Sequence, residues 1–389
     1  MDYAGLKVLD LSQGIAGPYC ATLLAQQGAD VIKVEPPSGD WGRGVGAARE
    51  GISAVALVGN AGKRAIALDA ARPEAQALLL RMAERADVVV QNYRPGVIER
   101  LGLGYAAVAA RNPALVYLSI TGFGADGPEA SRPATDSVLQ SLAGLAWLNR
   151  DADGTPRRFP LLIPDTVTAL YAAQAVGAAL FARMRTGRGR HVQMSLLEAC
   201  AAFQAMPILD AALFPGKRVP LTVPSGVFRT ADGWLTLVSV NETTFRGALR
   251  ALGLDAWIDD ARFALPAARQ RHADELNREV ARILAGADSA HWTRRLVEED
   301  ALFAPIQDYD GLRAMEQAKC LGLFDGCEQP SFGQVPLARQ PGAAPGWQAR
   351  PAPRIGEHAN EILRQLGLDG PEIEALAACG ALFRPPAAS

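Results

Sequence analysis

One aspartate at the start of a long apolar run is the residue best suited to covalent chemistry in this sequence. Asp165 follows Pro164 and precedes the apolar residues 166–182, so the pattern predicts that it caps a helix. A helix N-terminus favours an ionised carboxylate, and apolar surroundings remove the water that weakens a nucleophile. Capping alone contributes about 1 kcal/mol and is the usual role of such a residue, but it is compatible with nucleophilic attack.

Two loops that follow predicted strands could hold an anionic ligand. Residues 14–18 (GIAGP) open a helix after the first strand, where free backbone N–H groups can bind an anion. Residues 92–96 (NYRPG) follow another strand and are expected at the carboxyl edge of the sheet, with Arg100 in the next helix. Neither loop has the full glycine spacing of a dinucleotide motif, and each alone is more often a plain turn.

Composition argues against several other functions. The formal net charge is −2 with both signs interspersed, so no basic surface for nucleic acid is expected. Five scattered cysteines and four widely separated histidines predict no metal site and a reducing, cytoplasmic location. The apolar run 166–182 is shorter than the roughly 20 residues of a membrane span and predicts a buried helix, so no membrane partner is expected. The N-terminus also lacks the features of a secretory signal.

Short apolar strands alternate with amphipathic helices in the first half of the chain. Helices are predicted over 17–27, 73–85, 135–148 and 165–185, the last expected to be buried on all sides in the centre of the fold or of an oligomer. Strands are predicted over 8–11, 31–34, 66–68, 88–90, 115–120 and 192–196. This alternation predicts an α/β fold with a largely parallel sheet that helices cover on both faces.

The length of 389 residues predicts two domains, because one core seldom organises so long a chain. A composition break near residues 215–224 precedes a strand over 234–240 and a helix over 242–252. A smaller α+β domain is expected to begin there. The chain is then expected to return through a proline-rich segment to a closing helix over 357–366.

Several segments, taken together and in order, resemble the family III CoA-transferases (CaiB/BaiF type). They are residues 6–11 with 16–18, 28–37 (GADVIKVEPP), 63–64, 92–96, 122–124 with 127–128, Asp165, 186–189 (TGRG) and 353–358 (PRIGEH). The match spans nearly the whole chain.

The resemblance implies a Rossmann-like large domain, residues 1–222 with 328–389, and a small α+β domain, residues 223–327. It also implies an interlocked homodimer. Acyl-CoA and a carboxylic acid are then substrates, and no tightly bound cofactor is expected. Asp165 matches the catalytic aspartate. The residues that match CoA-holding positions are Ile15, Ala16, Leu68, Asn92, Tyr93 and Arg100.

The sequence departs from the formyl-CoA branch of this family. That branch has glutamine, arginine and lysine where this chain has Ile15, Pro36 and Ala71, so Arg43 or Arg72 is expected to supply phosphate charge instead. Formyl-CoA and oxalate are therefore poor candidate substrates, and succinyl-CoA is a reasonable first donor from the habits of the family.

Three functions fit the resemblance. A CoA-transferase would use Asp165 to form an aspartyl anhydride and then an aspartyl-CoA thioester. An α-methylacyl-CoA racemase or epimerase needs an acid and a base, but Thr135 stands where that branch has histidine. A CoA-binding protein without turnover would not need Asp165. The sequence favours the transferase.

Overall fold

The computed structural model describes residues 2–151, 153–216, 222–343 and 346–384, and the chain divides into two compact units. The larger unit is Met1–Ile208 with Gly322–Ser389, and the smaller is Leu209–Leu321. The predicted boundary at residue 222 follows residues 217–221, which lie outside the described residues. The boundary predicted at residue 327 would cut strand β12 (Phe324–Gln329), whose Cys327 packs against Ala61 and Leu337 of the larger unit. The whole strand therefore belongs to that unit.

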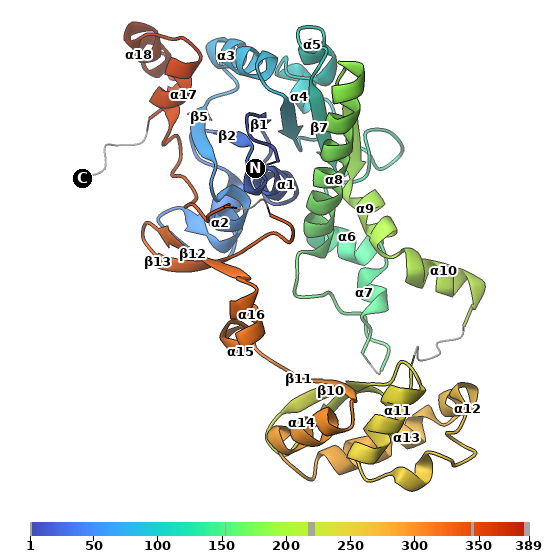
Figure 1. The fold of residues 1–389 in the computed structure, drawn as a ribbon. Helices are drawn as coiled ribbons and strands as arrows, with labels where there is room; N and C mark the ends of the chain where they lie inside the picture. Colours follow the sequence, from blue (N-terminus) through green and yellow to red (C-terminus); the bar gives the residue numbers. More distant parts are fainter. Residues whose placement is uncertain (1, 152, 217–221, 344–345, 385–389) are drawn as a thin grey trace. The chain divides into compact units, whose positions relative to one another are not determined.

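A sheet of seven strands forms the centre of the larger unit, in the order β14-β5-β2-β1-β6-β7-β8. Figure 1 labels the strands β5, β2, β1 and β7 of this sheet. The strands from β5 to β8 in this order run parallel, and β14 pairs antiparallel with β5 at one edge. Their bounds are β1 (Lys7–Asp10), β2 (Asp30–Glu35), β5 (Arg64–Leu68), β6 (Val88–Gln91), β7 (Val116–Thr121), β8 (His191–Ser195) and β14 (Leu382–Phe383). The parallel sheet predicted from the apolar runs is confirmed, because each predicted run overlaps one strand.

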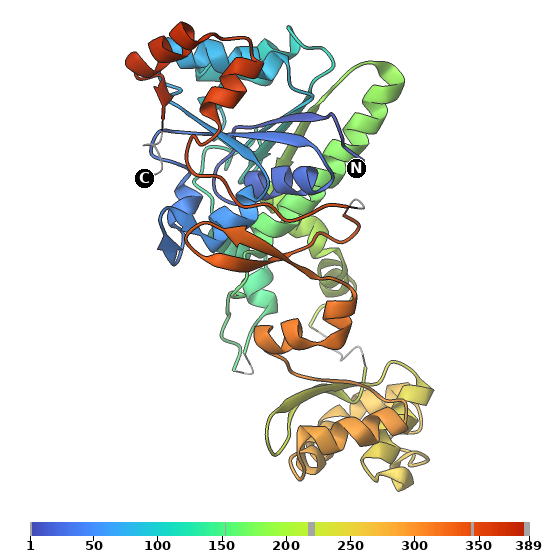
Figure 2. The same ribbon diagram turned by 60° about the vertical axis from the view of Figure 1, so that its left-hand side comes forward.

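Helices cover both faces of this sheet. Alternate residues of a strand point to opposite faces, so Val8 and Leu9 of β1 lie in different apolar clusters. One cluster takes in α3 (Pro73–Glu84), α17 (Ala359–Gln365) and α18 (Gly370–Ala378), which lie near one another in Figure 2. The other cluster takes in α1 (Ala16–Gln26), α8 (Ile163–Thr186) and α9 (Leu196–Phe203).

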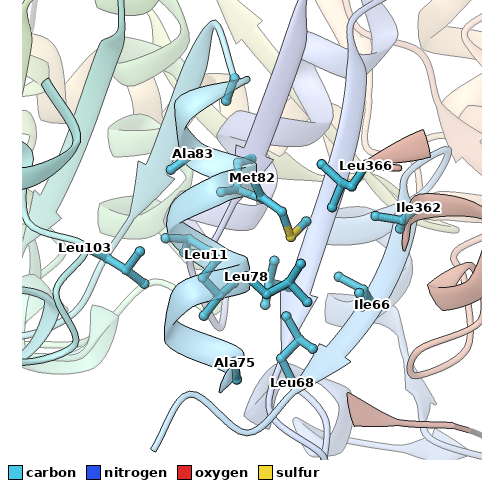
Figure 3. Packing of buried hydrophobic residues seen from close by; sticks show 14 of the residues in the cluster. Leu11, Ile66, Leu68, Ala75, Leu78, Met82, Ala83, Leu103, Ile362 and Leu366 are labelled. Atoms are coloured by element: carbon cyan, nitrogen blue, oxygen red, sulfur yellow. The ribbon is translucent and has the colours of Figure 1, made fainter. Parts of the chain in front are cut away.

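The C-terminal helices complete a core that the first third of the chain begins. Figure 3 shows Leu78 and Met82 of α3 facing Ile66 of the sheet and, from the C-terminal segment, Ile362 and Leu366. All five residues are nearly inaccessible to solvent. Burying such side chains contributes roughly 1.5 to 3 kcal/mol each, so the C-terminal segment is integral to this core.

Helix α8 is buried on only one side within this chain, so it does not lie in the centre of the fold, and its burial within an oligomer stays a prediction. Ala172 and Val176 are buried, whereas Leu170, Phe181 and Met184 are 49%, 63% and 83% exposed. By length and composition α8 could cross a membrane, as could the bent pair α9 and α10 (Ala205–Leu213). That criterion is weak, because buried core helices also meet it. In this chain α8 packs one face on the core and presents an apolar stripe outward.

Two predicted helices have different bounds in the structure. The helix predicted over 135–148 is two helices, α6 (Asp136–Leu142) and α7 (Leu145–Leu148), because Gly144 adopts φ +89° between them. The closing helix starts at Ala359 rather than at 357, because His358 is held by β5. Its backbone N–H donates to the carbonyl of Ala65, and its Nδ1 accepts from the N–H of Ala65 at 3.3 Å.

The smaller unit is an α+β unit with its own core. Its antiparallel sheet has the order β11-β10-β9, formed by β9 (Ser225–Arg229), β10 (Trp234–Val238) and β11 (Leu302–Pro305). The helices α11 (Glu242–Ala251), α13 (Ala273–Leu284) and α14 (Ser289–Glu298) pack on it through residues such as Phe245, Leu276 and Leu296.

Candidate active site

A cavity of about 480 Å³ opens at the carboxyl ends of β1, β6 and β7, all within the larger unit. The predicted residues that line it are Ile15, Ala16, Asn92, Tyr93 and Asp165. The parallel arrangement brings them together, because every strand of such a sheet ends at the same edge. The cavity is therefore the place where the predicted nucleophile and most of the predicted CoA-holding residues meet.

Asp165 lies inside the first turn of α8 and does not cap the helix as predicted. The helix begins at Ile163, with Leu162 in the capping position, since Pro164 is compatible with the first turn. The backbone N–H of Asp165 donates to Oδ2 of Asp136 at 3.3 Å. A second carboxylate thus occupies the end of α8 where a cap would otherwise stand.

Two carboxylates meet in this part of the cavity, and the pKa of each is raised. Burial, and after it the charge of Asp136, raises the pKa of Asp165 to about 7. Burial also raises the pKa of Asp136, although hydrogen bonds from Gln140 and from the N–H of Asp165 oppose the rise. The helix end was expected to favour ionised Asp165, but burial and the neighbouring charge outweigh it. Asp165 is therefore a carboxyl group that titrates near neutral pH and still has partial access to the cavity.

The loop between β1 and α1 forms one wall of the cavity, and Asn92 holds it in place. The N–H of Gln13 donates to Oδ1 of Asn92 at 2.8 Å, and Nδ2 of Asn92 donates to the carbonyl of Gln13 at 2.6 Å. At Gly14, φ is +79° and a Cβ would lie 2.0 Å from the indole of Trp41. Only glycine leaves room for this ring, which also lines the cavity.

Buried ion pairs lie beneath the same loop. Nζ of Lys63 lies 2.7 Å from Oδ2 of Asp10, and Nζ of Lys33 lies 2.8 Å from Oδ2 of Asp40. Oδ1 of Asp40 accepts from the N–H of Gly14 at 2.8 Å and so ties the loop to the pairs. Fully buried charges need partners of this kind, and here the partners also support the cavity wall.

A close contact holds the segment between β7 and α6 against the sheet. A Cβ on Gly122 would lie 2.2 Å from Cβ of Ala134, so only glycine allows this approach. Thr121 at the end of β7 accepts a hydrogen bond from the N–H of Gly124 at 3.0 Å. The segment leads directly to Thr135 and Asp136, which line the cavity.

Four predicted residues lie outside the lining of this cavity, and one of them, Arg72, pairs with Asp69 at 3.3 Å. Leu68 lines a smaller cavity of about 70 Å³, which shares Tyr93 with the larger one. Arg100 is exposed on α4 (Val97–Arg100). Arg43 is buried, with Nε and Nη2 donating to Glu35 at 2.6 and 2.7 Å. Arg43 therefore braces Glu35 inside the fold instead of offering charge to a phosphate.

Sequence reasoning did not assign several lining residues to the site, among them the aromatic and charged residues Trp41, Arg94, Arg132 and Asp136. Arg94 lies within residues 92–96 and Asp136 directly follows Thr135. Both positions adjoin residues that the sequence patterns single out, so their place at the site could have been predicted. Trp41 begins a short 3-10 helix (Trp41–Gly44) and Arg132 lies in a loop, and neither belongs to a sequence pattern that indicates a site. Among the described residues no group of three or more His, Cys, Asp or Glu side chains is placed to hold a metal ion.

Known proteins resemble this chain over almost its whole length. The model of CoA-transferase family III matches residues 3–359. A succinate–glutarate CoA-transferase of Agrobacterium fabrum is 34% identical over 385 residues, which cover 93% of this chain and 95% of that protein. A succinyl-CoA–D-citramalate CoA-transferase of Chloroflexus aurantiacus is 30% identical and covers 93% of each chain. The crystal structure of a CaiB/BaiF family protein from Brucella suis matches with a TM-score of 0.83 at 29% identity, over 94% of this chain and 99% of that one.

Proposed function

The chain belongs to CoA-transferase family III, and we propose that it moves coenzyme A from an acyl-CoA donor to a small carboxylic acid through covalent intermediates on Asp165. One observation carries the proposal: Asp165 lines a cavity of about 480 Å³ together with four of the six residues that match CoA-holding positions. Succinyl-CoA is the first candidate donor, because the succinate–glutarate and the succinyl-CoA–D-citramalate CoA-transferases are similar to most of this chain.

The first half of the reaction loads CoA onto the enzyme. A carboxylate oxygen of Asp165 attacks the thioester carbonyl, the C–S bond breaks and CoA leaves as a thiolate, which gives a mixed anhydride. The thiolate attacks the aspartyl carbonyl of that anhydride, and the donor acid leaves as its carboxylate. The product is an aspartyl-CoA thioester.

The second half repeats these steps with the acceptor. The acceptor carboxylate attacks the aspartyl thioester and expels CoA thiolate, and the thiolate then attacks the acceptor carbonyl of the new anhydride. The new acyl-CoA leaves, and the Asp165 carboxylate is regenerated with no net change in protons. Both kinds of intermediate hydrolyse readily, so a cavity that restricts water favours transfer over hydrolysis.

CoA in this proposal lies along the β1 and β6 side of the cavity. Ile15, Ala16, Asn92 and Tyr93 line that side, and Leu68 lines the adjoining small cavity. The exposed Arg100 would meet the phosphates outside the cavity. The racemase alternative is disfavoured, because Thr135 lines the cavity where a base would be needed and a threonine hydroxyl is too weak a base for that role.

The test is covalent labelling of Asp165. Wild-type protein incubated with succinyl-CoA and hydroxylamine should acquire an aspartyl hydroxamate at Asp165, located by mass spectrometry of peptides. Asp165→Asn should neither transfer CoA nor acquire the label. The control Asp126→Asn changes an exposed loop carboxylate outside the cavity, so it should still transfer CoA and be labelled at Asp165. Substantial transfer by folded Asp165→Asn would refute the proposal.

We further propose that the active form is an interlocked homodimer. Support comes from apolar surface that this chain leaves exposed, including Phe181 and Met184 of α8 and Met206 of α10 at 63%, 83% and 83%. Helix α10 has no buried residue in this chain. Exposed apolar surfaces of this kind mark association sites. Light scattering with activity measured on dilution tests the proposal, and a stable, active monomer would contradict it.

A further inference from the structure

The charged groups of the cavity lining suggest which acids the enzyme handles. Among the described residues that line it, the acids are Asp136 and Asp165 and the cations are Arg94 and Arg132. We infer that Arg132 binds the distal carboxylate of a dicarboxylic substrate, which makes dicarboxylic acids and their CoA thioesters the preferred class. The inference rests on the proposed CoA transfer and adds a specificity-determining residue to it.

The strand order separates the two arginines. Arg94 directly follows Tyr93 at the end of β6, on the side of the cavity proposed for CoA. Arg132 lies in the segment between β7 and α6, four residues before Asp136, whose carboxylate accepts from the N–H of Asp165. The order β1-β6-β7-β8 therefore places Arg132 on the acyl side and Arg94 on the nucleotide side.

The surroundings of Arg132 allow its guanidinium group to exchange one carboxylate partner for another. Its guanidinium carbon lies 5.6 Å from the centre of the Phe123 ring, and Nη1 lies 2.9 Å from Oε2 of Glu129. The side chains of Arg132 and Glu129 are 46% and 52% exposed, and an exposed ion pair of this kind contributes little. A substrate carboxylate can therefore replace Glu129 as the partner of Arg132. The new ion pair is stronger than the exposed one because it is shielded from water within the cavity.

The neighbouring acids explain why a cation is needed there. A second carboxylate on the substrate enters a cavity that already holds Asp136 and Asp165, and like charges oppose it. Arg132 compensates for that repulsion. A monocarboxylic acyl chain of equal length has no group for Arg132 to bind, so the arginine discriminates between the two.

The experiment compares two donors that differ in one terminal group. Succinyl-CoA and butyryl-CoA have equally long acyl chains, and only the first ends in a carboxylate. With acetate as acceptor, kcat/KM for both donors is measured for wild type, Arg132→Gln, Arg132→Lys and Arg94→Gln. The control Arg111→Gln removes an exposed arginine that pairs with Glu84 and does not line the cavity.

Wild type should prefer succinyl-CoA, and Arg132→Gln should lower that preference about 10- to 100-fold. Arg132→Lys keeps the charge and should retain part of the preference, whereas Arg94→Gln should affect both donors equally. An equal loss for both donors in Arg132→Gln, or a wild-type preference for butyryl-CoA, would overturn the inference. If the wild type transferred CoA from neither donor, that result would instead refute the proposed function, so the two failures are distinguishable.

Discussion

The ionisation of Asp165 should control the rate of CoA transfer around neutral pH. Only the carboxylate can attack a thioester, and burial with the charge of Asp136 raises the pKa of Asp165 to about 7. With that pKa, the ionised fraction falls from about nine tenths at pH 8 to about one tenth at pH 6. We therefore expect kcat/KM to fall about tenfold over this interval, whereas an ordinary carboxyl group, ionised at both values, would leave it nearly constant.

The assay measures kcat/KM for one donor and one acceptor across this interval in wild type and Asp136→Asn. The same substrates are used for both proteins, so titration of CoA and of the acceptor affects them alike. The substitution removes the like charge while its amide oxygen can still accept from the N–H of Asp165, so the midpoint should move to lower pH. A flat wild-type profile between pH 6 and pH 8 would refute the assigned ionisation, and an unmoved midpoint would refute the contribution of Asp136.

Three further predictions concern stability and binding. Because the folded state raises the pKa of Asp165 above its unfolded value, the fold loses stability progressively as the pH rises between the two pKa values; Asp165→Asn should therefore raise Tm more at pH 8 than at pH 5, and equal shifts at both would contradict this. Asn92→Ala removes two hydrogen bonds to the β1–α1 loop, each contributing about 1 kcal/mol, so kinetics should show KM rising by a similar factor for every acyl-CoA. Gly122→Ala places a Cβ 2.2 Å from that of Ala134 and should lower both Tm and activity, while Gly44→Ala, with nothing within 4 Å, should change neither.

The sheet could be predicted from the sequence because its signals are local. Short β-branched runs such as 31–34 and 88–90 stand between turn residues, and a strand buried on both faces needs only such a run. Helix ends were harder to predict. Gly144 interrupts the segment 135–148 by adopting a left-handed conformation, which an apolar pattern does not report.

The site was predictable where a residue follows a recognisable strand or helix. Asp165, Asn92 and Tyr93 met that condition, and all three line one cavity. The environment of Asp165 could not be predicted, because its pKa depends first on its burial and then on Asp136, which only the folded chain brings to its backbone. Arg43 was misassigned for the same reason: its partner Glu35 comes from a separate element, and the sequence does not show that the two pair.

The interrupted layout of the larger unit bears on how the protein is made. Helices α17 and α18, which cover one face of the central sheet, and β14, which adds a strand at one edge, are translated only after the whole smaller unit. At about 5 to 20 residues per second, the intervening residues delay that closure by on the order of ten seconds. During this delay the apolar face of β5 and the inner face of α3 lack their cover on the nascent chain. We therefore expect folding intermediates with this face open to be the species that chaperones bind, and premature termination within the last 30 or so residues to leave a chain that aggregates.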